Sequence, residues 1–302
     1  MGFISELFGY VLNALYNLIS NYGIAIIIFS VLLRLILIPI TIKQQKTMKK
    51  SNEMQQEMKN IQAKYKNNPE KLNQETMELY KREGLSPFSG CFTAILQLLI
   101  ILSVFWLVSQ PLTYMKRVQN SEIYKEYKTA VEGDSSKSSY KEIAIINKAS
   151  EDYQNIINEL KNENVENREE LENRKAQLEE LRINMEFLGL DLSKVPTQSL
   201  NDWKVYIIPA LYVITSFISI RITTKTQMSK SKNGEEEKTP ELESMEQMNK
   251  SMSYMMPIMS ISIAVIAPLG LALYWLVSNI LMIVERLVIN KFMSSKEEKE
   301  NA

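Results

Sequence analysis

Long apolar blocks alternate with polar and charged blocks along this chain. The first apolar block, residues 23–42, reads GIAIIIFSVLLRLILIPITI and has the length of about 20 residues that a helix needs to cross a bilayer. Later apolar blocks, each bounded by polar residues, cover 90–110, 203–223, 252–267 and 269–289. This pattern predicts an all-α membrane protein with five transmembrane helices.

Residues 1–22 show a different pattern, in which apolar residues recur in pairs every three to four positions. That period places them on one face of a helix. Glu6, Asn13 and Asn17 lie off this face. We therefore predict an amphipathic helix in the membrane interface, and the alternative is a further, weak span.

Residues 43–84 are polar, and they contain more Lys and Arg than acidic residues. An Asn-Asn-Pro sequence at residues 67–69 interrupts the helical pattern, because proline cannot continue a helix. We expect two helices that pair as a hairpin. Met48, Met54 and Met58 form a stripe on the first of them. These side chains either pack inside the hairpin or give client proteins a flexible apolar surface.

The longest polar segment, residues 112–202, is net acidic. Its residues 133–139, GDSSKSS, have the composition of a linker. After the linker, the spacing of apolar residues predicts two helices at about 140–161 and 166–187. Their apolar faces would pair as an antiparallel coiled coil.

The composition limits the chemistry that is available. The chain has 35 basic and 35 acidic residues, no histidine and a single cysteine, Cys91. Histidine-based catalysis and a cysteine cluster for zinc are therefore excluded. No nucleotide-binding motif occurs, and the charge balance does not favour nucleic-acid binding. We expect a protein that is not an enzyme and that needs neither a cofactor nor a metal.

The distribution of basic residues predicts the orientation in the membrane. Short loops rich in Lys and Arg stay in the cytoplasm, and the hairpin 43–84 carries several lysines directly beside the first span. Long segments cross the membrane largely regardless of charge, so the insertion 112–202 can lie outside. Five spans then place residues 1–22 outside, and the loop 224–251 and the tail 290–302 in the cytoplasm.

Arg34 is the charged residue of the first span. It lies about 12 Å from Ile42 at the cytoplasmic end of that span. A charge at this depth costs roughly 2.5–3.5 kcal/mol on insertion scales, so water, polar groups or a partner must surround it. Gln97 lies roughly 10 Å deep from the same side. It either joins Arg34 in a polar pocket or bonds neighbouring helices together.

Three further sets of residues stand out in the last two spans. Trp275 falls in the outer half of the last span. Ser260 and Ser262 either line a polar path or pack at helix contacts. Glu285 and Arg286 lie near the end of the last span, where we expect them to reach the lipid headgroups.

Several segments resemble the YidC/Oxa1/Alb3 family of membrane protein insertases. YGIAIIIFSVLLRLILIPITIKQQK, residues 22–46, is similar to the family's first span with its groove arginine. GCFTAILQLLIIL, residues 90–102, resembles the second span with its groove glutamine. FLGLDLS and PLGLALYWLVSNILMIVERLVINK, residues 187–193 and 268–291, resemble the later part of the fold. The resemblance covers the chain except for most of residues 112–185.

The resemblance implies a monomeric insertase and chaperone in the bacterial plasma membrane, with a hydrophilic groove that is open to cytoplasm and lipid. Arg34, Gln97 and Trp275 would be its groove residues. Short polar segments of nascent membrane proteins would pass through the groove, and their apolar helices would be released into the bilayer. The ribosome and the Sec translocon are the implied partners. The chain departs from the family at Leu99, where a proline is usual, and in its longer insertion.

Two other functions are compatible with the pattern. Arg34 would be the binding site of an anion channel or transporter. Alternatively, the external coiled coil would bind a partner, and the protein would be a membrane scaffold.

Overall fold

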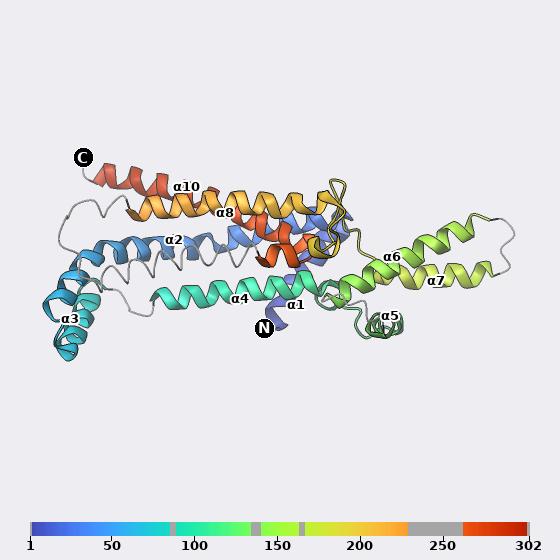
Figure 1. The fold of residues 1–302 in the computed structure, drawn as a ribbon, viewed down its shortest axis with the longest axis horizontal. Coiled ribbons are helices and arrows are strands. Elements are labelled where there is room, and N and C mark those ends of the chain that lie inside the picture. Colours follow the sequence, from blue (N-terminus) through green and yellow to red (C-terminus); the bar gives the residue numbers. More distant parts are fainter. Residues whose placement is uncertain (1, 85–88, 134–139, 163–166, 229–261, 301–302) are drawn as a thin grey trace. The chain divides into compact units, whose positions relative to one another are not determined.

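The computed structural model describes residues 2–84, 89–133, 140–162, 167–228 and 262–300, and these residues are mostly helical (Figure 1). The helices are α1 (Gly2–Ile19), α2 (Tyr22–Lys64), α3 (Pro69–Arg82), α4 (Ser89–Ser109), α5 (Glu122–Gly133), α6 (Lys141–Leu160), α7 (Arg168–Leu181), α8 (Ile207–Met228) and α10 (Leu269–Glu300). Short elements join them: a π-helical turn (Leu112–Lys116), 3-10 turns (Pro196–Gln198 and Trp203–Tyr206), and antiparallel strands β1 (Glu186–Phe187) and β2 (Leu190–Asp191).

The chain forms two compact units. The first unit comprises Met1–Val31, Ile100–Tyr212 and Ile261–Val277, and the second comprises Leu32–Leu99, Val213–Ser260 and Ser278–Ala302. The boundaries fall within α2, α4, α8 and α10. Each unit is described below on its own.

Three helices of the first unit, α5, α6 and α7, pack against one another (Figure 1). The predicted helix at 140–161 matches α6 closely, whereas α7 is shorter than the predicted 166–187. Arg182 takes an extended conformation at the C-cap of α7, and the chain then enters the β-hairpin. The coiled-coil pair therefore has a third helix, α5, that was not predicted.

Glu142 joins this helical bundle to the π-helical turn. Its carboxylate accepts hydrogen bonds from the backbone N–H groups of Leu112 and Thr113 at 2.7 and 3.0 Å. The hydroxyl groups of Thr113 and Tyr124 also donate to it. Glu142 is buried, and burial raises the pKa of its carboxyl, while these hydrogen bonds offset part of the increase. The residue is therefore a structural connection and not a solvated charge.

The N-terminal segment forms the predicted helix, and α1 packs on the π-helical turn. Gly9 makes this possible, because a Cβ atom there would lie 1.9 Å from the carbonyl oxygen of Tyr114. The hydroxyl of Ser5 donates to the carbonyl of Ser103 at 3.0 Å. On the other side of α1, Phe3 and Leu18 are 79% and 83% exposed. The interfacial location of this helix stays a prediction.

The β-hairpin of the first unit holds the starts of two long helices. Its tip, Leu188 and Gly189, has positive φ at both residues, as a tight two-residue hairpin turn requires. A Cβ on Gly23 would lie 2.6 Å from the ring of Phe187, so only glycine fits this close approach. The N–H of Gly270 donates to the carbonyl of Leu192 at 2.9 Å. The segment FLGLDLS therefore fastens α2 and α10.

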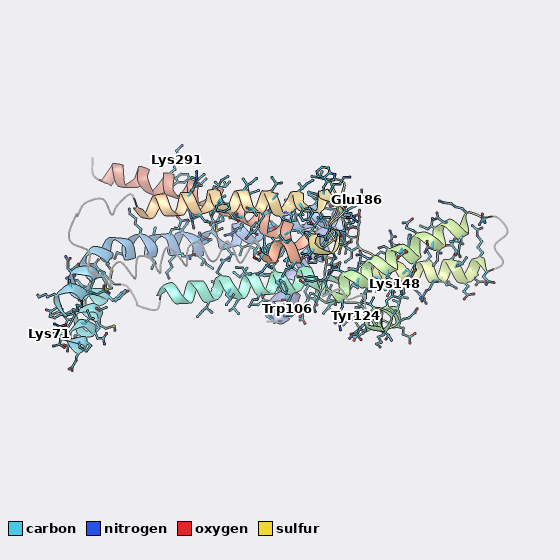
Figure 2. All side chains as sticks on the ribbon, viewed as in Figure 1. Lys71, Trp106, Tyr124, Lys148, Glu186 and Lys291 are labelled. Carbon is cyan, nitrogen blue, oxygen red and sulfur yellow. The ribbon has the colours of Figure 1, made fainter. Side chains whose placement is uncertain are left out.

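Three helices of the described chain are long and apolar enough to cross a membrane: Tyr22–Thr47, Trp203–Ile222 and Leu269–Ile289. Ile95–Ser109 of α4 is a shorter apolar helix, and it carries Trp106 (Figure 2). The Trp106 side chain is 39% exposed. Most of the predicted span 252–267 lies outside the described residues. The protein is thus a helical membrane protein, and its five spans stay a prediction.

The hairpin of the second unit begins without interruption from the first span. α2 is one helix of 43 residues with Pro39 inside it, and it ends before the Asn-Asn-Pro sequence, as predicted. The side chain of Asn68 caps α3 by accepting a hydrogen bond from the N–H of Lys71. Lys50 donates to the carbonyl of Glu83 at 2.8 Å, so α3 folds back along α2.

We predict that Glu142→Ala loosens the π-helical turn. The change leaves the N–H groups of Leu112 and Thr113 without their acceptor, which costs about 3 kcal/mol. Amide hydrogen exchange in detergent should then quicken at both residues by roughly 100-fold. Glu151→Ala, at an exposed position of α6, is the control and should leave both amides protected. Equal protection in the two variants would contradict the structural role of Glu142.

Candidate functional site

Arg34 points away from the exposed apolar face of α2. Leu32, Leu35 and Ile36 beside it are 39%, 56% and 73% exposed, whereas the side chain of Arg34 is 17% exposed. Apolar side chains of this kind can face lipid. The sequence prediction that Arg34 needs a polar environment therefore has a structural counterpart on the other side of the helix.

That environment is the face of α10 that carries Ser278 and Glu285. Nη2 of Arg34 donates to the carbonyl oxygen of Ser278 at 3.4 Å, and Nη1 lies 3.5 Å from Oε2 of Glu285. Ser278 and Glu285 are two helical turns apart, so they share one face of α10. The guanidinium thus bridges a backbone dipole and a carboxylate.

Glu285 differs from its prediction. It was expected at the headgroups, but its side chain is 10% exposed and faces Arg34. Neither carboxylate oxygen has a hydrogen-bond partner among the described residues. The correction has a simple cause: a guanidinium removed from water attracts the nearest carboxylate, and no local sequence pattern shows that the two residues meet.

The pair compensates charge without adding much stability. Two unit charges about 4 Å apart attract by about 4 kcal/mol at an effective dielectric constant of 20. Removing each ion from water costs several kcal/mol, and good hydrogen bonds are needed to recover that cost. Since Glu285 has none among the described residues, the attraction does not recover the cost for both ions, and the pair adds no net stability. Its contribution is to make a buried Arg34 tolerable.

A second polar contact lies next to this pair. The side-chain amide of Asn279 donates to the hydroxyl oxygens of Thr215 and Ser216, both at 3.1 Å, and so joins α10 to α8 within the second unit. Hydrogen bonds of this kind contribute about 0.6 kcal/mol on average between membrane helices. Sequence analysis missed Asn279, although a polar residue inside the apolar run LVSNIL was a usable signal.

For the other predicted groove residues, the structure describes no contact with Arg34. Gln97 is exposed on α4 and has no hydrogen bond to another described residue. Trp275 belongs to the first unit, where its ring lies 6.3 Å from that of Tyr212. Ser262 is exposed, and Ser260 lies outside the described residues. A groove that contains Arg34, Gln97 and Trp275 stays a prediction.

The methionine stripe of the hairpin is partly buried. Met54 is 6% exposed, so it packs inside the hairpin, and its contact with clients stays a prediction. Met58 is half-buried, and the side chain of Met48 lies outside the described part of the chain. Met77 on α3, which was not predicted, is 46% exposed. An adaptable surface on this hairpin would therefore involve Met58 and Met77.

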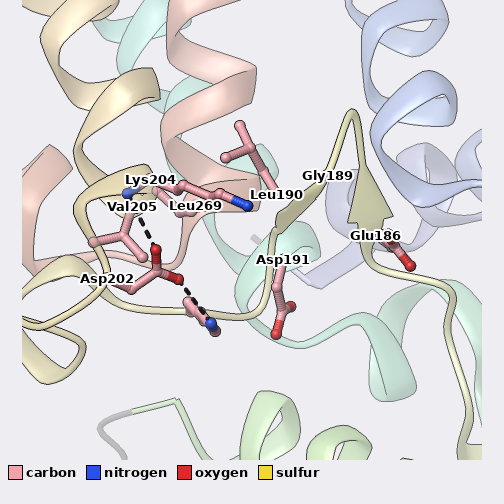
Figure 3. Close-up of a pocket in the computed structure, with 9 residues that line it drawn as sticks. Glu186, Gly189, Leu190, Asp191, Asp202, Lys204, Val205 and Leu269 are labelled. Atoms are coloured by element: carbon pink, nitrogen blue, oxygen red, sulfur yellow. Dashed lines mark hydrogen bonds and ion pairs between the residues drawn. The ribbon is translucent and has the colours of Figure 1, made fainter.

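A polar pocket of about 370 Å³ lies in the first unit, beside the β-hairpin (Figure 3). Lys194 and Asp202 form an ion pair there at 2.9 Å, and this hydrogen bond lowers the pKa of Asp202. Asp202 also accepts from the N–H of Lys204 and so caps the 3-10 turn before α8. These contacts order the chain between β2 and α8. Among the described residues, no cluster of three or more acidic or cysteine side chains could hold a metal.

Comparison with known proteins places the chain in a family. The family model described as 60Kd inner membrane protein matches residues 14–297, almost the whole length. The chain belongs to the YidC/Oxa1/Alb3 family. The Arg34 span and the LYWLVSN segment that carried the resemblance both lie within this match.

Individual relatives are similar over different lengths. A membrane protein insertase YidC of Treponema denticola is 25% identical over 94% of this chain and 37% of its own length. Those of Caldanaerobacter subterraneus and Fusobacterium nucleatum are 39% and 37% identical over about a third of this chain, 35% and 34%. The chain spans at most about half of each of these relatives, between 37% and 51%.

We predict different accessibilities along the hairpin. In a Cys91→Ser background, Met77→Cys should react with a water-soluble maleimide at least about tenfold faster than Met54→Cys, because a buried thiol is protected from reagent. Met58→Cys should react at an intermediate rate. Equal rates at positions 54 and 77 would mean that the hairpin opens and that Met54 is available to clients.

Proposed function

We propose that this protein is a membrane protein insertase and chaperone. The observation that carries the proposal is Arg34, a charge within an apolar span. It is paired with a carboxylate that accepts no hydrogen bond from the described residues. Family membership supports the same function. The anion-channel and scaffold alternatives gain no comparable support from the described residues.

In the proposed mechanism, Arg34 attracts acidic residues in the outer segment of a client protein. A polar groove that reaches Arg34 from the cytoplasm shortens the hydrocarbon barrier that the client's polar segment must cross. The client's apolar helix then enters lipid, which releases about 0.8 kcal/mol per buried CH₂ group. Burial of that helix drives insertion, so the proposal needs neither a cofactor nor an enzymatic reaction.

The proposal includes an orientation and partners. The protein lies in the bacterial plasma membrane with five spans, its N-terminus outside and its C-terminus in the cytoplasm. It acts as a monomer on nascent membrane proteins, together with the ribosome and the Sec translocon. The basic hairpin beside the first span supports a cytoplasmic location for α3.

We predict that Arg34→Ala lowers insertion of a single-span client with an acidic outer segment by tenfold or more. The loss follows because the client's carboxylate no longer meets a cation at mid-depth. Arg34→Lys should retain part of the activity, since lysine keeps the charge but not the planar fork of donors. The measurement is protease protection of the client in proteoliposomes with equal amounts of each variant.

Arg221→Ala is the matched control, because Arg221 is an exposed arginine on α8. Its insertion activity should equal that of the unchanged protein. Unchanged insertion in both Arg34 variants would refute the proposed function. Anion flux through the same proteoliposomes, lost in Arg34→Ala while insertion persists, would favour the channel instead.

A further inference from the structure

Glu285 is a buried carboxylate that accepts no hydrogen bond from the described residues. It comes from a segment 251 positions after Arg34, yet its carboxylate lies against the guanidinium within the second unit. The side chain is nine-tenths buried, and both of its oxygens lack a hydrogen-bond partner in the described chain. A carboxylate has about four positions that can accept hydrogen bonds. Among the described residues, the Glu285 carboxylate has the Arg34 guanidinium as a charge partner but no hydrogen-bond donor.

The N···O distance of the Arg34–Glu285 pair is longer than in strong guanidinium–carboxylate pairs. Charge-assisted bonds between guanidinium and carboxylate have N···O distances of about 2.7–2.9 Å and are frequently bidentate. Nη1 of Arg34 lies 3.5 Å from Oε2 of Glu285, and Nη2 donates a hydrogen bond to the carbonyl oxygen of Ser278. A second carboxylate with freedom to approach end-on would make shorter bonds. The pair is thus open to exchange.

Exchange would not leave Glu285 alone as a buried charge. Arg286, the next residue of α10, interacts electrostatically with both Glu285 and Arg34. A cation therefore stays beside Glu285 when Arg34 turns to another anion. The Glu285 carboxylate is therefore shared by Arg34 and Arg286, and the Arg34 guanidinium can change partners.

We propose that Glu285 occupies Arg34 in the absence of a client and is displaced by a carboxylate of the client's outer segment; this rests on the proposed function. Glu285 is then a specificity-determining residue. A neutral segment cannot displace it, and a basic segment is repelled by the remaining cation. An acidic segment must compete with a carboxylate that is tethered to α10 and therefore present at high effective concentration.

The proposal predicts that removing the resident charge strengthens client binding. Apparent affinity falls in proportion to the fraction of sites that are competent to bind. With Glu285→Gln, that fraction rises, so half-maximal photo-crosslinking of a single-span peptide with an acidic outer segment should occur at about five- to tenfold lower concentration. A peptide with a neutral segment should be unaffected. Arg34→Ala should abolish the difference between the two peptides.

Two variants serve as controls. Glu285→Asp keeps the charge and should retain the affinity of the unchanged protein more closely than Glu285→Gln does. Glu78→Gln removes an exposed acidic charge from α3 and should not change crosslinking. If Glu285→Gln binds the acidic peptide no more tightly while Arg34→Ala still weakens binding, the role of Glu285 is overturned and the proposed function stands. If Arg34→Ala has no effect, the proposed function itself fails.

If the Glu285→Gln variant does not accumulate, a double variant that exchanges the two charges can be tested in its place. The double variant Arg34→Glu with Glu285→Arg restores an ion pair of opposite polarity, so the helices regain their charge balance. Because the cation now lies on α10, preference for the acidic peptide should be lost, and a peptide with a basic segment should crosslink in its place. Unchanged preference for acidic peptides would show that neither residue meets the client, and that result would overturn this proposal together with the proposed function.

Discussion

A guanidinium within an apolar helix is the constraint around which the second unit is arranged. Hydrocarbon does not tolerate Arg34 by itself, so α10 must supply a carbonyl and a carboxylate on the face that meets α2. Ser278 and Glu285 supply this compensation at the point where α10 meets Arg34. The apolar residues Leu35 and Ile36 can then face outward, since the charge is turned inward.

The first unit solves a different problem, which is to fix the positions where long helices begin. Gly9 and Gly23 allow backbone and ring atoms to approach α1 and α2 so closely that a Cβ would collide. The N–H of Tyr22 donates to the carbonyl oxygen of Asn184 at 3.0 Å. The N–H of Leu269 donates to the carbonyl oxygen of Lys194 at 2.9 Å. One irregular segment after α7 therefore holds the beginnings of both α2 and α10.

Local chemistry made much of this fold predictable. Apolar length predicted spans at residues 23–42, 203–223 and 269–289, where the structure has helices that are long and apolar enough to cross a membrane. The Asn-Asn-Pro sequence located the break before α3. Contacts between distant segments were not predictable in the same way. Apolar spacing continues through Met185, so a helix to residue 187 was expected, but hydrogen bonds from the β-hairpin region hold that stretch extended. Only the fold shows that Glu285 meets Arg34.

Comparison of two buried glutamates clarifies what Glu285 is suited for. Glu142 accepts four hydrogen bonds, two from backbone N–H groups, and its removal would leave those donors unsatisfied. Glu285 accepts none among the described residues and offers Arg34 only a nearby charge. A fully bonded carboxylate fixes a structure, because every alternative partner is worse. A carboxylate held by charge alone can be replaced by an anion that also forms hydrogen bonds. Glu142 therefore stabilises the fold, whereas Glu285 is an exchangeable counter-ion of Arg34.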